Sequence, residues 1–289
     1  MSVTHNKTRS ASDFLLLTIG LVSVGTVLFF TFASSVSFSP DRQIDALAKD
    51  VIQRVPIALF LLVLCLTTDL KSGLRFTVTP AVRLFALVPC LLVALANFPF
   101  SALLGGGATV QKNQYVWLFC LQCLLIGVIE ELFFRLIVWR FADEKMRGKH
   151  VVWRVVACSA VFALWHLVNL FFGQGFAATL LQAGYSFLIG AMLSTLYLVT
   201  NNIWWCVLVH ALFDVGGKLV ATLGSGNVWD VPFWIATAVC GTLCAVWTLF
   251  TLVGCGITKR QTAACRLKTS KPKTQKTKII RCKTIKHRP

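Results

Sequence analysis

Eight long apolar runs constrain the fold of this 289-residue chain more than any other feature of its sequence. A transmembrane helix needs about 20 mostly apolar residues, and the runs that meet or approach this length are 14–38, 53–68, 80–98, 115–141, 151–172, 176–200, 203–223 and 231–256. Charged residues make up only 13% of the chain, about half their share in a typical soluble domain. We therefore predict an all-α, polytopic membrane protein with about eight transmembrane helices.

The positive charge of the chain is unevenly distributed. The formal net charge is +17, and 12 of the 28 lysines and arginines follow Thr258 in a segment without acidic residues. Cytoplasmic loops are enriched in Lys and Arg, and with eight spans the basic loops after the second and fourth runs lie on the same side as this segment. We therefore expect both termini in the cytoplasm. The predicted parts are a short cytoplasmic N-terminus (1–13), a membrane domain (14–257) and a basic, disordered cytoplasmic tail (258–289).

The same composition indicates which partners to expect. Membrane lipids surround the apolar runs, and the basic tail is attracted to anionic headgroups. Nucleic acid is not an expected partner, because the tail has neither a folded module nor aromatic residues among its basic ones.

Ionisable side chains inside three of the runs are the candidates for a functional site. Glu130, Glu131 and Arg135 lie in run 115–141, and His166 lies in run 151–172. His210 belongs to run 203–223 and is followed four residues later by Asp214. A charged side chain near the centre of a bilayer costs roughly 2.5–3.5 kcal/mol on insertion scales, so such residues usually mark a site with a function.

Helix geometry predicts how these side chains are oriented. Residues four apart share a helix face, so Glu131 is expected to pair with Arg135, and Asp214 is placed to orient His210. Glu130 is turned by about 100° from Glu131 and is free to face another helix. The helix rise puts the groups near the membrane midplane or in its cytoplasmic half, which predicts one polar intramembrane cavity.

These residue types suit hydrolysis. A carboxylate helped by an imidazole can take a proton from water, and a second imidazole with a polar neighbour can stabilise an oxyanion. The same donors are also a plausible set of zinc ligands, since two histidines and one carboxylate leave a coordination position for water. The candidate ligands are Glu130, His166, His210 and Asp214. The residues leave the zinc-dependent and metal-free alternatives open.

Three short motifs carry a resemblance to a known family. The segments Glu130–Arg135 (EELFFR), Phe162–His166 (FALWH) and His210–Asp214 (HALFD) resemble the EExxxR, FxxxH and third, His-containing motifs of the CAAX protease and bacteriocin-processing (CPBP) family. The resemblance covers about residues 115–220. This family of intramembrane endopeptidases is related to the type II CAAX prenyl proteases, whose substrates are membrane-associated proteins that include prenylated CAAX proteins.

The resemblance implies a role for each motif residue. It implies that Glu130 activates water with His166 as its partner, and that Glu131 and Arg135 support them together with Phe162. It implies oxyanion stabilisation or metal binding for His210 and Asp214. The family typically has Asn where this chain has Asp214, and a carboxylate donates a hydrogen bond only when protonated. Orienting His210 or binding zinc therefore suits Asp214 better than an oxyanion-donor role.

Two other functional classes compete with the endopeptidase. Members of the family are associated with bacteriocin immunity and with non-catalytic scaffolding of membrane proteins. Intramembrane Glu and His also form proton relays, which would make the chain a proton-coupled transporter. The substrate we expect for the enzyme is a membrane-tethered peptide or protein.

Overall fold

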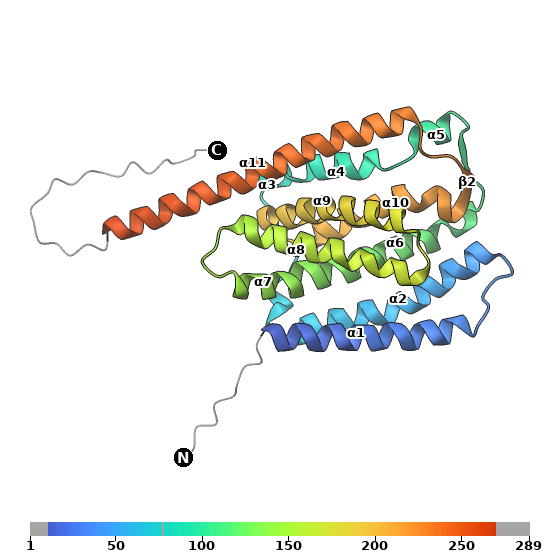
Figure 1. The fold of residues 1–289 in the computed structure, drawn as a ribbon, viewed down its shortest axis with the longest axis horizontal. Coiled ribbons are helices and arrows are strands. Elements are labelled where there is room, and N and C mark those ends of the chain that lie inside the picture. Colours follow the sequence, from blue (N-terminus) through green and yellow to red (C-terminus); the bar gives the residue numbers. More distant parts are fainter. Residues whose placement is uncertain (1–10, 77, 270–289) are drawn as a thin grey trace, which may run out of the picture.

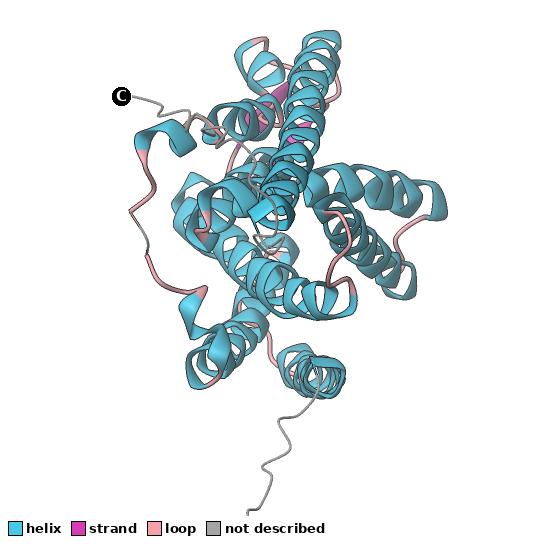
Figure 2. Ribbon diagram, turned by 90° about the vertical axis from the view of Figure 1, so that its left-hand side faces the viewer, coloured by secondary structure: helices cyan, strands magenta, loops and turns pink. Residues whose placement is uncertain are grey.

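The computed structural model describes residues 11–76 and 78–269, and nearly all of this part is helical (Figure 2). The helices are α1 (Ala11–Ser34), α2 (Arg42–Thr67), α3 (Ala81–Leu84), α4 (Leu87–Ala96), α5 (Phe100–Leu104), α6 (Val116–Glu131), α7 (Trp139–Lys145), α8 (Val151–Trp165), α9 (Phe176–Thr200), α10 (Ile203–Leu223) and α11 (Val231–Thr269). A π-helical segment, η3 (Leu132–Val138), joins α6 to α7, and a 3₁₀ segment, η4 (His166–Phe172), extends α8. Shorter 3₁₀ turns are η1 (Asp69–Ser72) and η2 (Asn113–Tyr115).

The predicted all-α, polytopic membrane architecture is confirmed. Within the described residues, six helical segments are long and apolar enough to cross a membrane, namely 42–67, 113–145, 151–172, 176–200, 203–223 and 231–254. The predicted run 14–38 falls largely within α1, whose described apolar stretch is 14–25, and run 80–98 corresponds to a shorter apolar stretch at 81–96. One small antiparallel sheet departs from the all-helical pattern: β1 (Ala108–Val110) pairs with β2 (Gly224–Gly226).

The second helix begins earlier than predicted. Run 53–68 is only the apolar part of α2, which starts at Arg42. The Asp41 side chain caps this start by accepting hydrogen bonds from the backbone N–H groups of Gln43 and Ile44. The apolar-run criterion missed these first turns because they are polar.

Close contacts between helices determine where the site forms. Helix α6 packs against both α2 and α10, and α8 packs along α9 (Figure 1). A Cβ at Gly127 of α6 would lie 3.1 Å from the backbone oxygen of Val207 in α10. At Gly190 of α9 a Cβ would lie equally close to Ser159 Cα in α8. The two glycines therefore allow backbone approaches that larger residues would disturb.

The hydrophobic core lies beside the π-helical segment. Every residue of η3 is buried, and its side chains pack with those of α2, α8 and α10. Helix α11 continues to Thr269, into the segment predicted as a tail. Residues 1–10 and 270–289, which hold most of the predicted N-terminal segment and tail, lie outside the described residues.

Candidate active site

The three sequence motifs meet in the middle of the bundle. Glu130 and Glu131 are the last residues of α6, and Arg135 lies in the π-helical segment that follows. His166 begins η4, at the point where α8 ends. His210 lies in α10, which packs against α6. A π-helical segment is rare and occurs often at functional sites.

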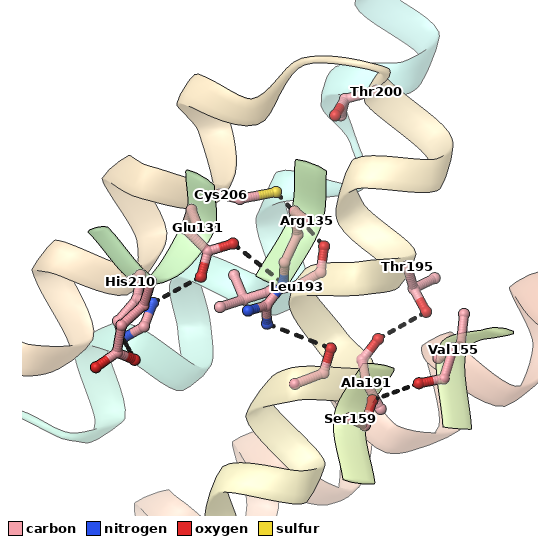
Figure 3. A network of polar contacts seen from close by, with 12 residues as sticks. Glu131, Arg135, Val155, Ser159, Ala191, Leu193, Thr195, Thr200, Cys206 and His210 are labelled. Carbon is pink, nitrogen blue, oxygen red and sulfur yellow. Dashed lines mark hydrogen bonds and ion pairs between the residues drawn. The ribbon is translucent and has the colours of Figure 1, made fainter. Parts of the chain in front are cut away.

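Glu131 and Arg135 form a buried ion pair, as the sequence predicted. Arg135 Nε lies 3.1 Å from Glu131 Oε2, and the side chains are 1% and 0% exposed. The contact lacks the alignment of a hydrogen bond. A terminal guanidinium nitrogen donates to the Gly190 carbonyl at 3.4 Å, and the guanidinium lies 4.9 Å from the ring centre of Phe162. The charge of Glu131 is therefore compensated inside the protein (Figure 3).

His210 lies between the two glutamates. Its Nδ1 is 2.7 Å from Glu131 Oε1, and its Nε2 is 3.6 Å from Glu130 Oε2. An ionised carboxylate can only accept a hydrogen bond, so Nδ1 donates to Glu131 and Nε2 is directed toward Glu130. Figure 3 shows Glu131 held between His210 and Arg135. The resemblance had implied His166 as the partner of Glu130, whereas the imidazole in contact with Glu130 is that of His210.

His166 occupies a different position in the same site. Its Nδ1 lies 2.8 Å from the Phe162 carbonyl oxygen, one turn earlier. A carbonyl can only accept, so in the neutral ring Nδ1 carries the proton and Nε2 has a free lone pair. The ring of Phe162 stands edge-on to both His166 and His210, at centroid distances of 4.9 and 6.0 Å. Phe162 thus packs between the two imidazoles.

The structure places Asp214 beside Lys218, whereas the sequence analysis placed it to orient His210. Its Oδ2 lies 3.0 Å from the ammonium nitrogen of Lys218, one turn further along α10. Lys218 lies inside the predicted run 203–223, yet the sequence-based set of candidate residues omitted it. Lys218 could have been identified by its four-residue spacing from Asp214, the same spacing that paired Glu131 with Arg135.

A cavity of about 740 Å³ connects these groups. Its charged, imidazole and amide side chains are those of Asp50, Gln53, Arg54, Glu130, His166, Asn169, Gln174, Gln182, His210, Asp214 and Lys218. Several of these side chains bind one another. Asp50 is bound by both Arg54 and Gln122, and the Gln182 side-chain oxygen accepts from Asn169 and Gln174 at 2.9 and 3.0 Å. Sequence reasoning assigned no role to these two groups, because Asp50 and Gln174 fall outside the predicted apolar runs and the amide residues inside the runs gave no motif.

The cavity extends toward one end of the bundle. Asn169, Gln174 and Gln182 line it from the η4–α9 junction, and Lys218 lines it from the last turns of α10. Toward the opposite end of the bundle, the buried residues of η3 follow directly after Glu131 and fill the interior. The polar path from Glu130 therefore leads toward the turn at 173–175, at the opposite end of α8 from the basic loop at 145–150.

The comparison with protein families agrees with the motifs and their geometry. Residues 112–216 match the family model described as type II CAAX prenyl endopeptidase Rce1-like. This segment is an Rce1-like domain. The Rce1-like domain contains all three motifs, and the predicted resemblance to the CPBP family is confirmed for residues 112–216. Comparisons with curated proteins and with solved structures gave no significant match.

A catalytic zinc site needs about three protein ligands that converge on one ion. Among the residues that the structure describes, no three His, Cys, Asp or Glu side chains converge as ligands of one metal ion. His210 Nδ1 is bound to Glu131, His166 Nδ1 to a backbone carbonyl, and Asp214 to Lys218. This arrangement does not fit a zinc site. The zinc-ligand assignment stays a prediction.

Proposed function

We propose that this chain is an intramembrane endopeptidase that hydrolyses a peptide bond of a membrane-tethered substrate, with Glu130 as the group that activates water. The Rce1-like family is one of CAAX-type intramembrane proteases. One observation carries the residue assignment. Glu131 is fully buried and compensated by Arg135 and His210, whereas Glu130 is the glutamate that lines the cavity.

The proposed reaction begins with a water molecule beside Glu130 and His166. Glu130 takes a proton from the water while the lone pair on His166 Nε2 accepts a hydrogen bond from its other O–H. The water oxygen forms a bond to the scissile carbonyl carbon, and the carbonyl oxygen becomes an oxyanion. Glu130 then gives its proton to the amide nitrogen, and the oxyanion re-forms a carbonyl group as the C–N bond breaks. A carboxylic acid and an amine leave, and the acid passes its proton to the amine.

His210 is proposed to stabilise the oxyanion. A protonated His210 is flanked by two carboxylates, and its Nε2–H faces Glu130 at the cavity wall. A donor at this position can bind the oxyanion as negative charge develops on it. The buried Arg135 guanidinium balances the charge of Glu131, so His210 can donate from both ring nitrogens.

Replacing Glu130 tests the assignment. Glu130→Gln keeps the size of the side chain and removes its basic oxygen, so we expect kcat for a prenylated CAAX peptide in vesicles to fall by about 10²–10⁴. Glu144→Gln changes an exposed acid outside the cavity and should leave kcat unchanged. Full activity of Glu130→Gln would refute the water-activating role.

The same assay tests the competing mechanisms and functions. Activity that a chelator abolishes and zinc restores would support the metalloprotease alternative. Wild-type protein that cleaves neither prenylated nor unprenylated tethered peptides, and that conducts protons across vesicles, would favour the transporter. A wild-type protein that neither cleaves peptides nor conducts protons would favour a scaffold or bacteriocin-immunity role.

A further inference from the structure

The segment that joins α2 to α4 leaves four large apolar side chains uncovered. They are Phe76 and Val78 in the loop after η1, Val82 in α3, and Phe85 directly after it, and each is between 73% and 95% exposed. Phe76 and Val78 lie outside all the apolar helices found among the described residues, so neither lies along the side of a membrane span. Apolar side chains gathered on one exposed segment mark a surface that contacts a partner or a membrane. We name this segment, residues 68–86, the α2–α4 connection.

Two tryptophans at the start of α10 hold the α2–α4 connection in place. Trp204 Nε1 donates a hydrogen bond to the Leu74 carbonyl oxygen at 2.9 Å, and Trp205 Nε1 donates to the Thr79 hydroxyl oxygen at 3.1 Å. Leu74 and Thr79 are both buried. The exposed apolar pair between these two contacts is therefore presented from two fixed points rather than from a loose loop.

Cations that lack an acidic partner stand among these apolar side chains. Lys71, Arg75 and Arg83 are exposed, and none of the three forms an ion pair with any residue that the structure describes. The one acidic residue of the connection, Asp69, is bound to Arg140. The connection therefore offers three positive charges to a ligand from outside the protein.

We propose that the α2–α4 connection binds the headgroups of anionic phospholipids, with its apolar side chains inserted beside them. The connection joins two membrane helices directly, so it lies at the bilayer surface, and the Asp69–Arg140 pair places it at the same end of the bundle as the basic loop 145–150. This end is the predicted cytoplasmic one, and the cytoplasmic leaflet carries anionic lipids. Lipid phosphate accepts charge-assisted hydrogen bonds from Lys and Arg, while neighbouring apolar side chains enter the headgroup–acyl boundary by about 5–10 Å. The membrane surface thus meets both the charge and the exposed apolar area.

Photo-crosslinking from the connection tests the inference. The full chain, with benzoylphenylalanine in place of Phe76, is reconstituted in vesicles of equimolar phosphatidylcholine and phosphatidylserine, and the lipid adducts are counted by mass spectrometry. We expect phosphatidylserine adducts to exceed phosphatidylcholine adducts about fivefold or more, because one Lys or Arg near an anionic surface contributes a factor of about five. High salt should lower this ratio by screening the charges.

Two matched triple variants locate the effect. Lys71→Gln/Arg75→Gln/Arg83→Gln should bring the ratio close to one while the total yield of lipid adducts stays high, which shows that the connection is still folded and inserted.

The control, Lys145→Gln/Arg147→Gln/Lys149→Gln, removes three exposed cations from the basic loop at the same end of the bundle, and it should keep the wild-type ratio. Absence of lipid adducts, equal yields of the two lipids in the unsubstituted connection, or an equal loss of preference in both triple variants would overturn the inference. None of these outcomes depends on cleavage of a peptide, so the proposed endopeptidase function stands or falls separately.

Discussion

Removal of Arg135 should destabilise the protein far more than removal of any surface arginine. Arg135→Met keeps much of the side-chain volume but leaves Glu131 without its cationic partner at 0% exposure. Breaking a buried ion pair from one side costs about 3–5 kcal/mol. The variant also loses the hydrogen bond to the Gly190 carbonyl and the contact with Phe162.

His210 determines how much of this 3–5 kcal/mol the Arg135→Met variant loses. Its Nδ1 stays within 2.7 Å of Glu131, so part of the charge of Glu131 remains compensated. We therefore expect a loss near the lower end, about 3 kcal/mol, which lowers the ratio of folded to unfolded protein by roughly 150-fold. Titration with SDS in mixed micelles, followed by tryptophan fluorescence, measures this free energy of unfolding.

Two further variants make the test specific to the pair. In the double variant Glu131→Gln/Arg135→Met no buried charge is left unpaired, so it should be more stable than Arg135→Met by about 1 kcal/mol or more. Arg140→Met removes an ion pair with Asp69 whose side chains are 37% and 69% exposed, and it should cost less than about 1 kcal/mol. An Arg135→Met variant as stable as Arg140→Met, or strictly additive effects in the double variant, would refute the reasoning.

Three other predictions concern packing, pH and topology. Gly216→Ala should lower the free energy of unfolding in the same SDS assay, because its Cβ would lie 2.9 Å from the backbone of Asn97, whereas Gly241→Ala meets no atom within 4 Å and should not. The hydrogen bond from Lys112 holds the pKa of Asp41 below its usual value. The stabilising contribution of the Asp41–Lys112 pair is present above the ordinary carboxyl pKa of about 3.9 and is lost as pH falls through the lowered pKa of Asp41. Lys112→Gln should therefore reduce the acid sensitivity of thermal unfolding. An unchanged pH profile would count against this pair. An epitope in the basic loop at 146–149 should be accessible from the cytoplasm and one in the turn at 173–175 from the other side, and the reverse result would place the polar end of the cavity on the cytoplasmic side.

Local spacing predicted part of the site correctly. The pair Glu131–Arg135 follows from two residues on one helix, and the structure contains it. The same rule would have paired Asp214 with Lys218, but the sequence-based reasoning considered His210 as the neighbour of Asp214 instead. Both His210 and Lys218 are four residues from Asp214. The local rule therefore gave two equivalent partners, and opposite charge selects the lysine.

Contacts between helices could not be predicted in the same way. Whether Glu130 meets His166 or His210 depends on how α6 is rotated against α8 and α10, and that rotation is set by packing. Gly127 allows α6 to lie close to α10 at Val207, one turn before His210. The bulky Phe162 meanwhile occupies the space between the imidazoles. A single sequence shows these residues but does not show which helix face they bring together.

The contacts of His210 explain why two adjacent glutamates serve better than one. Under the proposed mechanism, an imidazole held only by Glu130 would move as Glu130 gains and loses its proton. Here Glu131, fixed by Arg135 in the buried core, holds Nδ1 at 2.7 Å, and Nε2 is left at 3.6 Å from Glu130. Under the proposed mechanism, His210 thus keeps its contact with Glu131 when Glu130 gains a proton. Glu131→Gln should consequently reduce kcat through a misplaced imidazole even though Glu130 still lines the cavity.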